Sequence, residues 1–363
     1  MPQWEICSTP ACKLNKFIED HLLGDTALIS EIITDIEFIS DFLMDRCFNG
    51  AAHPVRASRV VMDGFYNEHT MLKGRAAVNL VVLFNNLTCF DEQLKRRGEF
   101  IEEIRKHLCQ LQQEEQFREK FEVRSSEQPN SRSLSFKLSY PEFQQEVEFD
   151  VQPAYDALCE VREKVEVDCE MYNKLYAQLI RECNILKTEG KFSICFTDLQ
   201  QNFLWKRPLE LKNLILLVKH WYQLCEEKLR QPLPPQYALE LLTVYAWECG
   251  AQDSSELYTA QCFRTVLELI TKYQHLRVYW TLYYDVLHEA VNAYLYTQSR
   301  KDRPLILDPA DPTWNVAGSN LQGWFRLAEE AKAWLKYPCF RHTDETFVGP
   351  WDVPPEKKGL VIL

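Results

Sequence analysis

Hydrophobic residues near the start of the chain recur at intervals of three and four, which is the spacing of one face of an α-helix. Between residues 13 and 46 this spacing predicts two successive helices. A third helix is predicted over residues 99–112, where one apolar stripe is surrounded by charged residues. The apolar positions are Leu14, Phe17 and Ile18, then Ile32, Ile36, Ile39 and Leu43, then Ile101, Ile104, Leu108 and Leu111. Each stripe is expected to face a hydrophobic core.

Other segments show the short apolar runs and the period of two that are typical of β-strands. The predicted strands cover residues 59–61, 79–84, 121–123, 134–138 and 147–151. The apolar runs of the first two suit a sheet that is covered on both faces. Residues 125–132 are polar and contain a proline, so they predict a loop.

From about residue 170 the pattern becomes helical. Residues 211–229 are apolar almost all round, so this helix is expected at the centre of a core. Proline-rich residues 232–235 separate it from a second buried helix at residues 237–247. Two more helices are predicted at residues 262–273 and 321–335.

A sheet region followed by a helical region predicts an α+β fold with two lobes, and the length of 363 residues suits two lobes. We expect an N-terminal sheet lobe at residues 1–160, a helical C-terminal lobe at residues 161–346 and a tail at residues 347–363. No apolar run reaches the length of a membrane span, so no membrane association is expected.

Charge and cysteine usage narrow the possible functions. The net charge of -12 argues against broad nonspecific nucleic-acid binding, although a local basic stripe remains compatible with it. The 13 cysteines are scattered without a C-x-x-C pair, so a zinc site is not expected. An odd cysteine count without a signal peptide favours a reducing, cytoplasmic compartment.

Five segments spread over nearly the whole chain carry a family resemblance. They are residues 16–23 (KFIEDHLL), 96–101 (RRGEFI), 218–223 (VKHWYQ), 234–247 (PPQYALELLTVYAW) and 306–313 (ILDPADPT). Together they resemble the 2'-5'-oligoadenylate synthetases, and the length is similar to that of a single-unit, type 1-like member. The resemblance implies a polymerase-β-like nucleotidyltransferase fold in the sheet lobe. It also implies a role in the interferon response of antiviral innate immunity, where active members, switched on by double-stranded RNA, join ATP into oligoadenylates.

The resemblance also locates the catalytic carboxylates, of which active members use three to hold two magnesium ions. Their Gly-Arg-Ser-Asp-Ala-Asp-Leu-Val-Val segment corresponds here to residues 74–82, which read GRAAVNLVV. Ala77 and Asn79 therefore stand at two carboxylate positions, and only the third remains, as Asp150. One carboxylate cannot assemble a two-metal site, so we predict a pseudoenzyme in which Asp150 is a relic and no cofactor is bound.

The phosphate-binding loop of the family is altered as well. Active members carry Gly-Gly-Ser-Ser-Gly-Lys-Gly-Thr, and residues 63–70 here read DGFYNEHT. Phe65 and Tyr66 add bulk, while Asp63 and Glu68 add negative charge beside a polyanion. The alternative is a weak RNA-dependent nucleotidyltransferase that uses Asp150, neighbouring Glu148 and one metal ion.

In the helical lobe, Lys219, Gln236 and Tyr237 match family positions that contact ATP, whereas Leu216 replaces a basic residue of that set. The resemblance therefore implies residual nucleotide binding without turnover. Simple core packing is the competing interpretation of Tyr237, which lies among apolar helix residues. It explains Lys219 less well, because a lysine in an apolar stretch needs a partner.

The resemblance also implies a basic stripe that binds double-stranded RNA through phosphate contacts. The family segment is close to LQRDFLKQRPTKLK, and residues 199–212 here read LQQNFLWKRPLELK. The basic or hydroxyl positions that are lost carry Met44, Met62, Gln201, Trp205, Leu209 and Glu210. The retained candidates are Ser58, Lys206, Arg207 and Lys212. These changes lower the expected affinity for RNA, and a solvated helix end is the competing interpretation of the remaining cations.

Near the C-terminus, Cys339, Phe340 and Arg341 resemble a Cys-Phe-Lys segment that is linked to oligomerisation in the family. Ordinary packing of an aromatic residue beside a turn is the alternative. Three hypotheses therefore remain open. The protein sequesters double-stranded RNA, or it binds active synthetase paralogues or copies of itself directly, or it is the weak transferase described above. A mixture of the first two is favoured.

Overall fold

The computed structural model describes residues 6–50, 54–63, 77–114, 117, 120–123, 133–162, 169–250, 258–342 and 344–357. The altered phosphate loop after residue 63 and the loop predicted at residues 125–132 lie outside the described residues. Contacts divide the chain into two compact units. We call Gly24–Trp205 with Leu282–Val291 the sheet unit, and Met1–Leu23 with Lys206–Thr281 and Asn292–Leu363 the helical unit.

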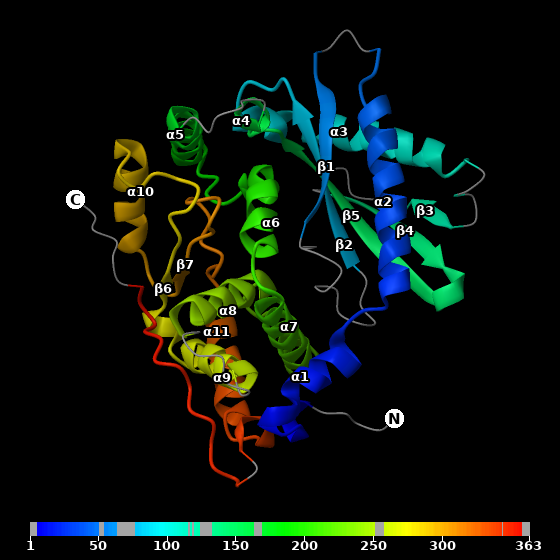
Figure 1. Ribbon diagram of the computed structural model, residues 1–363. Coiled ribbons are helices and arrows are strands. Elements are labelled where there is room, and N and C mark those ends of the chain that lie inside the picture. The colour runs from blue at the N-terminus through cyan, green and yellow to red at the C-terminus, as the bar shows by residue number, and fades with distance from the viewer. Residues whose placement is uncertain are drawn as a thin grey trace. The chain divides into compact units, whose positions relative to one another are not determined.

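The sheet unit is built on five strands in the spatial order β1-β2-β5-β4-β3 (Figure 1). The strands are β1 (Arg56–Asp63), β2 (Ala77–Asn85), β3 (Phe121–Val123), β4 (Leu134–Tyr140) and β5 (Gln145–Tyr155). All five predicted strands are therefore present. β2 and β5 pair in parallel and the other neighbouring pairs are antiparallel. The mixed sheet places segments far apart in sequence side by side.

Helices α2 (Thr26–Arg46) and α3 (Phe90–Leu111) bury their apolar stripes in one hydrophobic core with the sheet. The alternate residues Val78, Leu80 and Val82 of β2 point into this core. The predicted stripes of both helices are buried. The opposite face of the sheet is left for polar side chains at one end of β2 and β5.

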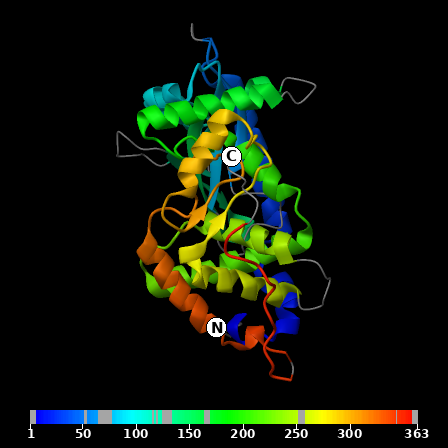
Figure 2. The same ribbon diagram turned by 90° about the vertical axis from the view of Figure 1, so that its left-hand side faces the viewer.

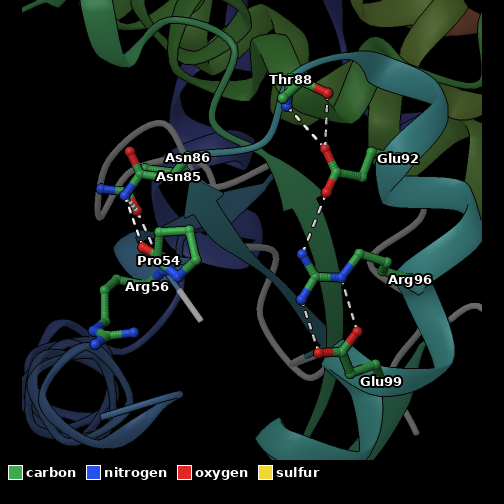
Figure 3. A network of polar contacts seen from close by, with 8 residues as sticks. All are labelled: Pro54, Arg56, Asn85, Asn86, Thr88, Glu92, Arg96 and Glu99. Carbon is green, nitrogen blue, oxygen red and sulfur yellow. Dashed lines mark hydrogen bonds and ion pairs between the residues drawn. The ribbon is translucent and has the colours of Figure 1, made fainter. Parts of the chain in front are cut away.

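Figure 3 shows how the connection from β2 to α3 is held. Glu92, in the first turn of α3, accepts hydrogen bonds from the backbone nitrogen and the hydroxyl of Thr88, at 2.9 and 3.1 Å. Arg96 then donates to Glu92 on one side and to Glu99 on the other. Glu92 thus fixes the residue that precedes the N-cap, Cys89, while the backbone nitrogen of Asp91 in the first turn donates to Glu182.

Three further helices belong to the sheet unit: α4 (Cys159–Arg162), α5 (Cys169–Leu186) and α6 (Thr197–Trp205). We expected the sheet lobe to end near residue 160, but the unit continues to Trp205. The physical reason is packing: Tyr176 of α5 stacks on Phe196, and Phe196 stacks on Phe90 of α3. Phe90 in turn makes an edge contact with Tyr155 of β5, so these rings join α5 to the sheet unit.

The helical unit contains α1 (Leu14–Phe17), α7 (Leu209–Leu229), α8 (Gln236–Gly250), α9 (Tyr258–Thr271), most of α10 (Glu289–Ser299) and α11 (Leu321–Trp334). Helix α7 is buried along most of its length, as its pattern predicts. Trp221 of α7 makes edge contacts with Phe263 of α9 and Trp334 of α11. Within the described residues, no helix is both long and apolar enough to cross a membrane.

A small sheet completes the helical unit, with β6 (Arg277–Val278) parallel to β7 (Leu305–Ile306). The C-terminal segment, drawn in red, runs beside β6 in Figures 1 and 2. The backbone of Arg277 pairs there with that of Glu356. The end of the described chain is thereby fixed to the edge of this sheet.

Candidate functional site

The parallel register of β2 and β5 brings the three degenerate metal-site positions together. Asn79 pairs with Asp150, and Ala77 pairs with Glu148. Because side chains alternate along a strand, positions two apart on paired strands share one face of the sheet. Ala77 and Asn79 are exposed and Asp150 is half-buried on this face. The backbone arrangement that the catalytic resemblance implies is therefore present.

The side chains at these positions do not fit a pair of magnesium ions. Alanine offers no ligand and asparagine offers one neutral oxygen. Asp150 Oδ1 instead accepts a hydrogen bond of 2.5 Å from the hydroxyl of Ser135 on β4. In the part of the chain that is described, no three metal-ligating side chains converge on one point. No step of metal-assisted chemistry can be assigned to these residues.

Of the residues that correspond to the phosphate loop, 63–70, only Asp63 lies within the described part of the chain. The backbone of Asp63, at the end of β1, pairs with that of Asn79. This register places the start of the loop next to the degenerate metal site. Phe65, Tyr66 and Glu68 lie outside the described residues, so their effect on phosphate binding stays a sequence prediction.

The nucleotide candidates of the helical unit meet at a buried carboxylate, Glu240 of α8. Gln236 donates a hydrogen bond of 3.1 Å to Glu240 Oε1, and Lys219 Nζ of α7 lies 3.7 Å from the same oxygen. Glu240 is 4% exposed, and its Oε2 has no hydrogen-bond partner among the described residues. Lys219 thus has the partner that its apolar surroundings require, and its charge is balanced inside the protein.

Tyr237 serves a second buried arrangement. Its hydroxyl donates a hydrogen bond of 2.9 Å to Asp308, and its ring stacks on Trp314 with centroids 5.6 Å apart. Asp308 also accepts hydrogen bonds from the backbone nitrogens of Ala310 and Asp311. Burial raises the pKa of the Asp311 carboxyl to about 7. Tyr237 therefore holds the Asp-Pro-Ala-Asp segment in place, which supports the packing interpretation.

Two residues that contact the candidate sites, one in each unit, were not predicted from the sequence. Glu240 lies four residues after Gln236 within the apolar stretch of residues 237–247, and a carboxylate inside that stretch was the available signal. Ser135 carried no signal, because its contact with Asp150 depends on the register of β4 against β5. Leu216, which replaces a basic residue of the family, is fully buried in α7.

In the sheet unit, the RNA candidate Ser58 is tied to an internal charge network. Its hydroxyl lies 2.6 Å from Asp156 Oδ2 and donates to it. Arg162 donates to Asp156 at 2.5 Å and to Asp198 at 2.9 Å, and Arg59 lies 3.5 Å from Asp198. Burial raises the pKa of Asp198. The Ser58 hydroxyl is therefore engaged within its own unit.

The three candidate cations of the helical unit differ in accessibility. Lys206 is exposed, whereas Arg207 Nη2 lies 2.7 Å from Glu248 Oε1 in an ion pair. Lys212 is only 7% exposed, and burial lowers the pKa of its ammonium group. At the positions where the family has a lysine and a hydroxyl, Trp205 and Leu209 are exposed. Among Lys206, Arg207 and Lys212, Lys206 is thus the solvent-exposed candidate.

The candidate oligomerisation segment is mostly internal. Cys339 and Phe340 are fully buried, and the Phe340 ring lies 5.2 Å from that of Phe263. Burial also raises the pKa of the Cys339 thiol to about 12. Arg341 is half-buried and lies over the exposed ring of Phe347. These positions favour ordinary packing for Cys339 and Phe340 and leave Arg341 as the accessible member.

Comparisons with known proteins identify the family of the chain. A family model described as 2'-5'-oligoadenylate synthetase 1, domain 2, C-terminus matches residues 169–356. The chain is 63% identical over 353 residues to the mouse protein named Inactive 2'-5' oligoadenylate synthetase 1C, covering 97% of this chain and 98% of that one. It is 61% identical to mouse Inactive 2'-5'-oligoadenylate synthase 1D, covering 99% of both. It is 59% identical to mouse 2'-5'-oligoadenylate synthase 1A, covering 96% of this chain and 93% of that one.

Among solved structures, CdnC in the Escherichia coli MS115-1 CdnC:HORMA-deltaN complex matches with a TM-score of 0.56 and 12% identity, covering 89% of both chains. At that identity the similarity concerns the fold, which is the α+β fold of the polymerase-β-like nucleotidyltransferases. The family model and the relatives reach further, because they match sequence over most of the chain. The chain therefore belongs to the 2'-5'-oligoadenylate synthetase family.

Proposed function

We propose that this chain is a catalytically inactive family member in the cytoplasm that modulates active synthetases of the antiviral response through protein contacts, with weak binding of double-stranded RNA. The observation that carries the proposal is the pairing of Asn79 with Asp150. The register supports the proposal of inactivity, because two of the three candidate metal-site positions that it places together, Ala77 and Asn79, offer no carboxylate. Two relatives that cover nearly the whole chain are themselves named inactive.

Weak RNA binding follows from how the retained candidates are used. Ser58 donates to Asp156, Arg207 is paired with Glu248, and Lys212 is buried. Each contact between a cation and an RNA phosphate adds affinity by releasing a counterion. Cations that are paired internally or buried supply little of that affinity, and Lys206 alone cannot replace a stripe.

The exposed apolar residue at one of the lost basic positions favours a protein partner. Trp205 is 63% exposed at a position where the family has a lysine. Tryptophan is enriched among the residues that dominate protein interfaces, whereas it adds no charge for RNA phosphates. An active family member is the partner that we propose, because relatives with nearly the same sequence share surfaces suited to related contacts.

The test combines the purified chain with mouse synthase 1A after nuclease treatment and measures co-sedimentation. We expect a complex that survives the nuclease and weakens in the Trp205→Ala variant. A matched control is Leu321→Ala, which removes another exposed large apolar side chain. Absence of any complex at micromolar concentrations would contradict the proposal of direct contact.

A parallel titration uses double-stranded RNA of about two helical turns over a salt series. We expect weak binding with a shallow salt dependence and a further loss in Lys206→Ala, but not in Lys336→Ala, which alters another exposed lysine. Tight binding with a steep salt slope would instead favour RNA sequestration as the function.

A further inference from the structure

Two arginines of the helical unit converge on one carboxylate beside the small sheet. Arg277 lies on β6, Arg303 lies two residues before β7, and Glu356 lies on the C-terminal segment. Arg277 Nη2 is 2.5 Å from Glu356 Oε1, and Arg303 Nη2 is 3.7 Å from the same oxygen. The arginine side chains are 22% and 25% exposed, whereas the glutamate side chain is 46% exposed.

The carboxylate leaves this pair of guanidinium groups incompletely satisfied. Arg277 Nε and Arg303 Nη1 are buried, and neither has a hydrogen-bond partner among the residues that the structure describes. Buried N–H groups of this kind are costly unless a ligand accepts from them. One negative charge also faces two positive charges, so the cluster retains a net positive charge.

The backbone fixes the position of the glutamate. The nitrogen of Arg277 donates to the carbonyl of Pro355 at 3.0 Å, and the nitrogen of Lys357 donates to the carbonyl of Arg277 at 2.9 Å. The Lys357 ammonium donates to the carbonyl of Tyr279. The strand-like pairing of the C-terminal segment with Arg277 therefore places Glu356 beside the two arginines.

We propose that Arg277 and Arg303 form a phosphate-binding site that Glu356 occupies as an internal carboxylate ligand. A tetrahedral phosphate presents three or four acceptor oxygens and up to two negative charges, so it can accept from guanidinium N–H groups that one carboxylate oxygen leaves unused. Arginine pairs suit such bidentate recognition better than lysines do. The site uses none of Lys219, Gln236 or Tyr237, so it is separate from the nucleotide candidates.

The phosphate group has two possible sources, a nucleotide or an RNA backbone, which share this chemistry. In both cases the ligand must displace Glu356, so the native chain is expected to bind phosphate weakly. Removing the charge of Glu356 while keeping its shape is expected to open the site. The Glu356→Gln substitution does this and leaves the backbone pairing of the segment intact.

The experiment is a calorimetric titration of the full chain and its variants with inorganic phosphate at low ionic strength. We expect Glu356→Gln to bind phosphate at least tenfold more tightly than the native chain, and the triple variant Arg277→Gln, Arg303→Gln, Glu356→Gln to lose that gain. Glu329→Gln, which removes an exposed carboxylate on α11, is the control and should match the native chain. A folded Glu356→Gln variant with no gain in phosphate affinity would overturn the proposal.

A second measurement does not depend on that substitution. Hydrogen exchange of the backbone amides of Val353, Glu356 and Lys357 in the native chain should accelerate when phosphate is added, because phosphate displaces the Glu356 side chain and weakens the hold on the segment. Unchanged exchange at saturating phosphate would also overturn the proposal. Titrating Glu356→Gln with ATP and with a short RNA duplex then distinguishes the two sources. The ligand whose affinity exceeds that of inorganic phosphate by the larger factor is the one that fits the site.

Discussion

Asn79 of β2 stands directly opposite Asp150 of β5 in a parallel register. Ala77 and Asn79 therefore lie beside Asp150 without offering a carboxylate, whereas the paired strands that carry all three positions are intact. Asp150 is stabilised without a metal, because Ser135 donates a short hydrogen bond to it. The three positions remain close enough to be rebuilt by substitution, which makes their geometry testable.

Restoring the carboxylates with Ala77→Asp and Asn79→Asp is expected to recover divalent-cation binding without recovering oligoadenylate synthesis. Without metal, repulsion among neighbouring carboxylates should lower the free energy of unfolding by about 1 kcal/mol. Manganese or magnesium should then raise the melting temperature of the variant but not that of the native chain. Synthesis should stay absent, because the residues 63–70 that replace the phosphate loop are unchanged.

The control for this experiment is Ala77→Ser with Asn79→Gln, which changes both side chains without adding charge. If manganese or magnesium does not change the melting temperature of the Asp variant, the three positions are not aligned as the register indicates. Oligoadenylate products from the Asp variant would show that the altered loop is compatible with catalysis.

Lys219 and Glu240 are expected to be energetically coupled. Substituting Lys219 by Met leaves Glu240 buried beside Gln236 without a counter-charge, which should cost roughly 3–5 kcal/mol of unfolding free energy. The Glu240→Gln substitution should cost less, and the double variant should recover most of the loss. Urea unfolding of the four proteins measures the coupling. Strictly additive losses would mean that the 3.7 Å separation reflects no functional ion pair.

Asp311 predicts a stability that falls as pH rises. Burial raises its pKa from 3.8 to about 7, so the folded chain holds a proton that the unfolded chain has already released in this window. Stability from this group is full below about pH 4 and is lost towards pH 7, at a slope of about 1.4 kcal/mol per pH unit. Asp311→Asn should flatten that slope in unfolding measured between pH 5 and 8.

The exposed Asp344 provides the matched control for this experiment. Hydrogen bonds from Thr346 lower the pKa of Asp344, so its stabilisation is lost only as pH falls through the acid range. Asp344→Asn should therefore leave the slope between pH 5 and 8 unchanged. An equal flattening in both variants would argue that the effect does not come from the buried carboxyl.

Periodicity predicted the elements of the fold well, because each depends on residues close in sequence. The stripe that includes Ile101 and Leu108 is buried in α3, and the apolar run at residues 211–229 became the buried helix α7. The boundary near residue 160 was not predictable in this way. It depends on Tyr176 stacking on Phe196, a contact whose existence no local pattern reports.

The sequence was sufficient to propose which residues form the candidate sites, but not which side chains surround them. A family resemblance located Ala77, Asn79 and Asp150, and the register then placed them together. The neutralisation of Lys219 by Glu240 and of Arg207 by Glu248 required the folded structure, because ion pairs depend on which helix faces meet. Fewer of the candidate cations are therefore available to a polyanion than the sequence alone suggests.

The bond between Ser58 and Asp156 has a consequence for any ligand that uses this hydroxyl. A ligand that accepts the proton of this hydroxyl, such as a phosphate oxygen, must first displace the carboxylate of Asp156. Its affinity is therefore lowered in proportion to the small fraction of molecules in which the hydroxyl is already released. Asp156 shares Arg162 with Asp198, so releasing it also changes the electrostatics at α6. Displacing Asp156 would therefore leave Arg162 with Asp198 as its remaining carboxylate partner in this network, which alters the charge balance at the start of α6.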